Sequence, residues 1–126
     1  MSGVLDVNAA DWVKEVLKTD TIVLVDFWHE HCPWCIRLDP VFSEVAEEYE
    51  GKVKFTKINV LDSDENREIA HKHGIMGTPT LVFFCDGRSI ETVTGFQPKE
   101  QLKQLVDDII KKHKDCIEKS TELKID

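Results

Sequence analysis

The sequence predicts an α/β domain with a central mixed five-stranded sheet flanked by four helices, in the order βαβαβαββα. Apolar runs that have the length of strands and are rich in the β-branched residues Ile and Val alternate with segments whose apolar residues recur at helical spacing. Asp86-Gly87 separates the last two strand-like runs, which indicates a β-hairpin. Parallel strands joined by helices therefore form the first half of the sheet, and an antiparallel hairpin closes it.

The first quarter of the chain predicts an edge strand, a helix and a buried strand. Residues 3–6 are the short edge strand. Asn8 is a suitable N-cap for a helix of about three turns, because apolar residues follow it at helical spacing. Residues 21–28 form an almost unbroken apolar run, which is typical of a strand buried on both faces. Asp26 interrupts that run.

A second helix and a third strand follow. The helix starts near Cys32 and ends before Gly51. Pro40 lies inside it and is expected to bend it after the first turn, because proline removes a backbone hydrogen bond. Residues 52–60 carry apolar side chains on both faces and fit a strand, with Lys57 at its centre.

The remaining elements are a helix, the hairpin and a last helix. Ser63 or Asp64 caps the third helix. Residues 80–85 and 88–94 are the two hairpin strands. Pro98, at the first helical position, opens the last helix.

The length and net charge of the chain limit the number of domains and the kinds of partner that it can have. We expect residues 1–110 to form one domain and residues 111–126 a charged extension, in which the helix frays into a mobile tail. The net charge of −8 argues against nucleic acid, and no apolar run suits a membrane span. The N-terminus lacks the basic start and apolar stretch of a secretory signal, which favours a cytoplasmic location, with a secreted form whose signal has been removed as the alternative. We expect the protein to be a monomer.

Cys32 and Cys35 are separated by two residues at the predicted start of the second helix. Their sulfurs can close into a small disulfide ring and reopen. At a helix N-cap, the thiolate of Cys32 would be stabilised by unpaired backbone N–H groups and by the helix dipole. Cys35, one turn deeper, is expected to be shielded and to resolve a mixed disulfide. The motif therefore predicts redox chemistry.

Zinc binding is the alternative for this motif. A zinc site needs about four ligands, and the other cysteines, Cys85 and Cys116, stand alone in the sequence. We therefore predict no metal site. Cys85, at a strand end, is expected to be buried as a small apolar residue. An exposed Cys116 would form intermolecular disulfides or be incidental, and neither cysteine is assigned a catalytic role.

Taken together, these patterns resemble the thioredoxin family over about residues 4–110. The features that carry the resemblance are Val25-Asp-Phe-Trp28, Cys32-x-x-Cys35, Pro40, Lys57, Gly77-Thr-Pro79, the Asp86-Gly87 hairpin and Gly95. The resemblance implies the thioredoxin fold and reduction of disulfides in client proteins. It also implies an electron donor of the thioredoxin-reductase type and no bound cofactor besides a redox-active Cys32–Cys35 disulfide.

By this resemblance, Cys32 is the nucleophile, Cys35 the resolving thiol and Asp26 a buried acid beneath them. Burial of a carboxylate is costly, so the pKa of Asp26 should rise and allow it to take the proton of Cys35. Lys57 is the expected moderating charge. The alternative is a merely structural pair of Asp26 and Lys57.

The resemblance also implies how clients bind. Pro79 is the expected cis-proline facing the sulfurs, which would turn the backbone of Thr78 toward them to pair with an extended client segment. The residues expected around this position are Trp34, Ile75, Met76, Gly95 and Phe96. Ordinary core packing is the alternative for Ile75 and Met76. Trp28 is assigned to packing against the active-site turn.

The motif departs from the family's usual Trp-Cys-Gly-Pro-Cys, because this chain has His31-Cys-Pro-Trp-Cys35. Pro33 followed by an aromatic residue resembles glutaredoxins, but their Gly-Gly-Asp glutathione pocket is absent after Pro79. Protonated His29 or His31 would stabilise the thiolate and make the disulfide a stronger oxidant. The alternatives are that both are solvated loop residues, or that they join the cysteines in an adventitious soft-metal site.

The sequence thus predicts a protein disulfide reductase. Three alternatives stay open: an oxidase or isomerase if the His-Pro-Trp setting raises the potential, a glutaredoxin-like activity, and a redox-inactive binding or metal-carrying module.

Overall fold

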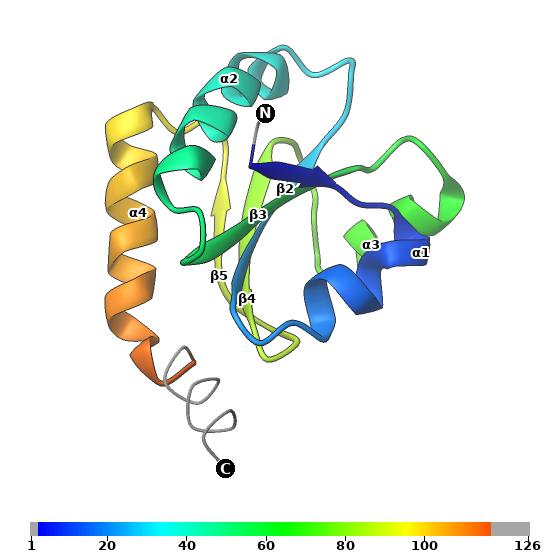
Figure 1. Cartoon of the computed structure of the whole chain (residues 1–126). Helices are drawn as coiled ribbons and strands as arrows, with labels where there is room; N and C mark the ends of the chain where they lie inside the picture. The colour runs from blue at the N-terminus through cyan, green and yellow to red at the C-terminus, as the bar shows by residue number, and fades with distance from the viewer. Residues whose placement is uncertain (1–2, 117–126) are drawn as a thin grey trace.

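A computed structural model describes residues 3–116, and its centre is a five-stranded mixed sheet with strand order β1-β3-β2-β4-β5 (Figure 1). The strands are β1 (Val4–Asp6), β2 (Ile22–Trp28), β3 (Val53–Asn59), β4 (Thr80–Cys85) and β5 (Arg88–Thr94). β3 runs parallel to both of its neighbours, whereas β4 is antiparallel to β2 and β5. The predicted sheet and its closing hairpin are therefore confirmed.

Helices cover both faces of this sheet (Figure 1). They are α1 (Ala9–Trp12), its π-helical continuation η1 (Val13–Leu17), α2 (Pro33–Glu48), α3 (Asp64–Lys72) and α4 (Lys99–Lys112). α2 and α4 pack on one face, and α1, η1 and α3 pack on the other. α2 continues through Pro40 as one helix. None of the helices in the described part of the chain is long and apolar enough to cross a membrane.

Three helix ends differ from the sequence prediction. The first helix is not a regular α-helix of about three turns, because the N–H of Lys18 bonds to the carbonyl of Val13 and widens its second half into η1. Pro98 is the N-cap of α4 instead of its first helical residue. After α4, residues 114–116 make a further helical turn. The rest of the expected mobile tail, residues 117–126, lies outside the described residues.

The central strand β2 separates two apolar clusters. Ile22 and Leu24 face α2 and α4, whereas Val23, Val25 and Phe27 face α1, η1 and α3. All five are fully buried. Because side chains alternate across a strand, the same alternation puts Asp26 on the face that α2 covers.

A buried asparagine ties α1, β3 and α3 together on the opposite face. The Oδ1 atom of Asn66 accepts a hydrogen bond from the N–H of Ala9 at 2.7 Å. Its Nδ2 atom donates to Oδ1 of Asn8 and to the carbonyl of Asn59, both at 3.0 Å. Since Asn66 is fully buried, these bonds replace all the water that its amide would otherwise contact.

We expect Asn66→Ala to lower the free energy of unfolding by about 3 kcal/mol, because it leaves buried donors and acceptors without partners. Urea unfolding measures this change, with Glu68→Ala on the exposed side of α3 as a matched control that should change stability by less than about 0.5 kcal/mol. Equal effects of the two substitutions would contradict the structural role of Asn66.

Candidate active site

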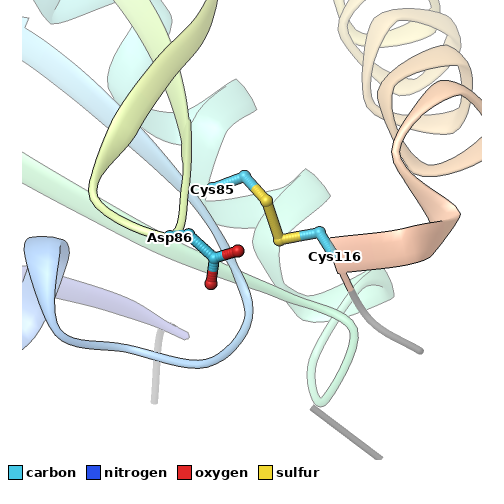
Figure 2. A group of neighbouring side chains, drawn as sticks. All are labelled: Cys85, Asp86 and Cys116. Carbon is cyan, nitrogen blue, oxygen red and sulfur yellow. A yellow bond between two sulfur atoms is a disulfide. The ribbon is translucent and has the colours of Figure 1, made fainter. Parts of the chain in front are cut away.

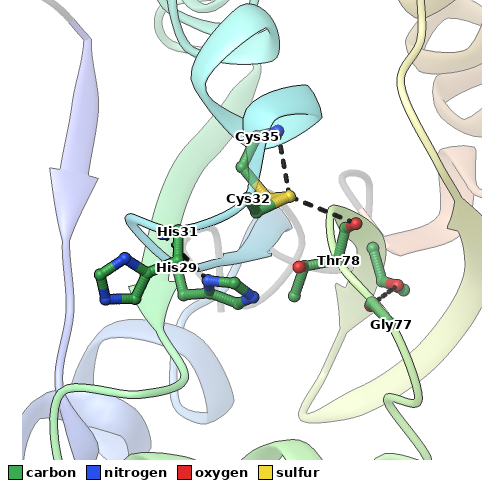
Figure 3. The surroundings of a disulfide bond; sticks show 7 residues. His29, His31, Cys32, Cys35, Gly77 and Thr78 are labelled. Carbon is green, nitrogen blue, oxygen red and sulfur yellow. Dashed lines mark hydrogen bonds between the residues drawn. A yellow bond between two sulfur atoms is a disulfide. The ribbon is translucent and has the colours of Figure 1, made fainter.

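Cys32 and Cys35 form a disulfide at the start of α2, in the loop that follows β2 (Figure 3). Cys32 is the N-cap of α2, and Pro33 occupies the first helical position, where its missing N–H is not needed. The N–H of Cys35 donates to Sγ of Cys32 at 3.2 Å. Both cysteines are buried, and this N–H is the hydrogen-bond donor that the first turn of α2 offers to Sγ of Cys32.

The segment before β4 approaches the same sulfur from the other side (Figure 3). Sγ of Cys32 lies 3.4 Å from the carbonyl oxygen of Thr78, and the peptide bond between Thr78 and Pro79 is cis. The carbonyl of Pro79 accepts a hydrogen bond from the N–H of Gly95 at 2.8 Å, which ties the segment to the end of β5. Backbone groups of this segment therefore border the disulfide.

Asp26 lies on β2 with 2% of its surface exposed, and its Oδ1 atom has no hydrogen-bond partner in the part of the chain that the structure describes. Burial raises the pKa of Asp26 to about 7, the positive charge of Lys57 counteracts this rise, and the negative charge of Asp39 adds to it. A carboxyl group with this pKa can gain or lose a proton near neutral pH.

Lys57 lies directly across from Asp26 on the neighbouring strand β3. Its Nζ atom is 2.9 Å from Oδ1 of Asp39 on α2 and 3.9 Å from Oδ1 of Asp6 on β1. It also lies 4.8 Å from the ring centroid of Trp28. The ammonium group thus forms its closest ion pair with Asp39, at the surface, and Oδ1 of Asp26 is left without a hydrogen-bond partner among residues 3–116.

The sequence matches a known protein family over most of its length. A family model described as thioredoxin matches residues 3–108. Thioredoxin 1 of Nostoc sp. is 40% identical over 107 residues, which cover 85% of this chain and 97% of the relative. Thioredoxin of Pseudomonas aeruginosa is 41% identical over 104 residues, covering 82% and 94%. A chloroplastic M-type thioredoxin of Brassica napus is 37% identical over 106 residues, covering 84% and 58%.

The chain belongs to the thioredoxin family. It is therefore a dithiol–disulfide oxidoreductase, and the Cys32–Cys35 disulfide is its redox-active group. This confirms the fold, the enzyme class and the redox interpretation of the motif. Asp39 is a member of the site that the sequence analysis missed, because its approach to Lys57 depends on where α2 lies over the sheet.

The expected rim of the thioredoxin site is only partly solvent-exposed. Met76 is 98% exposed and Trp34 is 52% exposed. The ring of Phe96 packs against Trp34 with a centroid distance of 5.5 Å, and the guanidinium of Arg37 lies 4.7 Å from the Trp34 centroid. Ile75 is half-buried against the apolar cluster under α3. Core packing is therefore excluded for Met76, whereas Ile75 both packs on the core and lines the groove beside Thr78.

The two histidines of the motif have local partners (Figure 3). Nδ1 of His29 accepts a hydrogen bond from the N–H of His31 at 3.1 Å. His31 is exposed, and its Nε2 atom lies 3.8 Å from Oε1 of Glu30. No ion pair or hydrogen bond joins either imidazole to Cys32 within residues 3–116. Their influence on the thiol stays a prediction.

The remaining cysteines were wrongly treated as separate residues by the sequence analysis. Cys85 and Cys116 form a second disulfide, with a Cα–Cα distance of 6.3 Å. Cys116 is buried instead of exposed, and Cys85 is half-buried. Together with Asp86 they make the only cluster of three metal-ligand side chains found among the described residues (Figure 2). Two of its three ligand atoms are already joined in the disulfide.

The raised pKa of Asp26 predicts a pH-dependent stability. Between about pH 4 and 7 the folded state holds a proton on Asp26 that the unfolded chain releases, so stability falls as the pH rises through this range. The expected loss is about 4 kcal/mol. Asp26→Asn removes it, so the variant should gain stability relative to the unmodified protein between pH 4 and 8.

Urea unfolding at several pH values measures this difference for the oxidised protein. Glu91→Gln, at an exposed position on β5, is the matched control and should leave the pH profile unchanged. Parallel profiles for Asp26→Asn and the unmodified protein would contradict the raised pKa.

A further substitution tests how Asp39 acts on Asp26. We expect Asp39→Asn to lower the pKa of Asp26, because it removes a negative charge and frees the ammonium group of Lys57. Carbon-13 NMR titration of the Asp26 carboxyl group measures the pKa. Asp6→Asn should have the smaller effect, because Asp6 lies farther from Lys57. An unchanged or higher pKa in Asp39→Asn would contradict this arrangement.

Proposed function

We propose that the protein reduces disulfides in client proteins, with Cys32 as the attacking thiol and Cys35 as the resolving thiol. The observation that carries this proposal is the position of Cys32 at the N-cap of α2, with the N–H of Cys35 directed at its sulfur. In the reduced form the same N–H and the helix N-terminus stabilise a thiolate on Cys32. The thiolate is the form that attacks disulfides.

The first step joins the protein to its client. The Cys32 thiolate attacks one sulfur of the client disulfide, a Cys32–client bond forms, and the other client sulfur leaves as a thiolate that takes up a proton. The carbonyl oxygen of Thr78 lies beside the reacting sulfur, so a client segment that pairs with this backbone is held at the point of attack.

The second step releases the client. Cys35 loses its proton, and its thiolate attacks Sγ of Cys32. The Cys32–Cys35 disulfide forms, and the client sulfur leaves as a thiolate. We assign the proton of Cys35 to Asp26, because this carboxyl group is buried and its pKa of about 7 suits proton transfer at neutral pH. Lys57 and Asp39 act on Asp26 as positioning residues.

Client recognition rests on backbone pairing and an apolar rim. Thr78 offers its backbone, Pro79 and Gly95 hold that segment in place, and Trp34 and Met76 offer exposed apolar surface. A groove of about 240 Å³ borders this surface and is lined by His29, Met76 and Thr78 among others. Such a site accepts many sequences, because its main contacts are with backbone atoms.

We further propose that a donor of the thioredoxin-reductase type returns two electrons to the Cys32–Cys35 disulfide, so the monomer works without a bound cofactor. The chain acts in the cytoplasm, where reducing conditions keep the dithiol in its reduced form. Its net charge of −8 suits protein clients better than nucleic acid or a membrane surface.

A trapping experiment tests the assigned order of the two thiols. We expect Cys35→Ser to accumulate a covalent Cys32–client disulfide, because the resolving thiol is gone, whereas Cys32→Ser forms no adduct and loses turnover by at least about 1,000-fold. Gel electrophoresis without reductant and peptide mass spectrometry identify the adduct, and insulin reduction measures turnover. An adduct through Cys35 in the Cys32→Ser variant would reverse the assignment.

Oxidase or isomerase activity is the second candidate. It is favoured by His31, Pro33 and Trp34, the residues around the disulfide at which this chain departs from the family's usual motif. Equilibration with defined glutathione buffers measures the reduction potential. A value near about −270 mV supports a general reductase, and a value of about −180 mV or higher supports the oxidising direction.

A further inference from the structure

The Cys85–Cys116 disulfide joins the end of β4 to the segment that follows α4 (Figure 2). Cys85 is the last residue of β4, directly before the turn of the β4–β5 hairpin. Cys116 lies in the helical turn that follows α4. The bond therefore fastens the segment after α4 to the end of a central strand, 31 positions earlier in the chain.

The two sulfurs differ in their surroundings. Cys116 is 4% exposed and belongs to the apolar cluster under α2 and α4, whereas Cys85 is half-buried at the edge of that cluster. Both cysteines line a hollow of about 330 Å³, to which Asp86, Arg88 and His113 also contribute. The hollow gives an attacking group access, and Cys85 is the more accessible partner.

The active site cannot reach this disulfide within one molecule. β4 begins next to Pro79, beside the Cys32 sulfur, and it ends at Cys85. Its six residues place the two disulfides about 16 Å apart along the strand. Any exchange between them must therefore occur between two copies of the protein.

We propose that Cys85 and Cys116 form a second redox site, a disulfide clasp that the reduced active site of another copy opens. The clasp is the Cys85–Cys116 bond between β4 and the turn after α4. The exchange, unlike the clasp itself, rests on the proposed function. Opening the clasp removes the one disulfide cross-link between the turn after α4 and the sheet within residues 3–116.

The exchange balances in atoms and electrons. The Cys32 thiolate of one copy attacks Sγ of Cys85 in the other, and Cys116 leaves as a thiolate and takes up a proton. Cys35 of the first copy then loses its proton and attacks Sγ of Cys32, which releases Cys85 as a thiolate that is protonated in turn. One Cys32–Cys35 disulfide forms, and one Cys85–Cys116 disulfide is lost.

Two variants separate the reactants. Cys32→Ser/Cys35→Ser retains only the clasp, and it is first oxidised with oxidised glutathione. Cys85→Ser/Cys116→Ser retains only the active site, and it is first reduced with dithiothreitol and desalted. After mixing, acid quenching, denaturation and maleimide labelling, intact mass spectrometry counts the thiols of each variant. We expect the clasp variant to go from no labels to two labels while the active-site variant loses two.

Three outcomes of this experiment would overturn the inference. Two labels on the clasp variant after oxidation would mean that no clasp forms. An unlabelled clasp variant after mixing, with an active-site variant that still reduces insulin, would mean that the exchange does not occur. If the active-site variant does not reduce insulin either, the proposed function fails, and the second site is tested by treating the folded clasp variant with dithiothreitol. Two maleimide labels on the clasp variant after that treatment support a reducible second site. No labels after that treatment would overturn it.

A trap identifies the attacked sulfur. Adding Cys35→Ser to the active-site variant should give a covalent heterodimer with the clasp variant, joined through Cys32 and Cys85. A peptide link to Cys116 instead would overturn the assignment of Cys85 as the attacked sulfur.

Thermal unfolding provides an independent readout of the clasp. We expect oxidation to raise the Tm of the clasp variant by about 10 °C, because the bond restricts the unfolded chain. The matched control is the same chain with Cys85→Ser and Cys116→Ser added, whose Tm should not respond to oxidation. An equal Tm for the oxidised and reduced clasp variant would overturn the inference that the bond fastens this segment.

Discussion

Strand β2 hydrogen-bonds to β3 on one side and to β4 on the other, and the whole site depends on this double pairing. Pairing with β3 sets Asp26 across from Lys57. Pairing with β4 brings the Thr78-Pro79 segment, which precedes that strand, beside the loop that carries Cys32. A shift of register by one residue would turn Asp26 to the other face of the sheet and separate it from Lys57 and α2.

The site retains a group that weakens the fold. A buried carboxyl group, one of whose oxygens has no hydrogen-bond partner in the described part of the chain, opposes folding once it is ionised, and apolar side chains on both faces of β2 offset that cost. Lys57 does not fully neutralise Asp26, because Asp39 holds the ammonium group at the surface. The arrangement leaves Asp26 able to exchange a proton near neutral pH, which a tight ion pair would prevent.

The strands, the hairpin and the reactive cysteines could be predicted from the sequence because their signals are local. Apolar runs marked the strands, and the two-residue spacing marked Cys32 and Cys35. The contact of Asp39 with Lys57 and the bond between Cys85 and Cys116 could not be predicted, because both depend on how helices dock on the sheet. The π-helical turn η1 was also missed, since five residues with hydrogen bonds that span five positions are too few to leave a periodic signal.

The surface position of Asp39 makes a buried acid responsive to dissolved salt. Asp39 and Lys57 meet where ions can approach them, whereas Asp26 is shielded by the protein. Added salt screens the exposed pair more strongly than the interaction of Lys57 with Asp26. It also weakens the repulsion between Asp39 and Asp26. Both effects favour the ionised form of Asp26. The ionic strength of the solvent therefore changes the protonation of a buried carboxyl group.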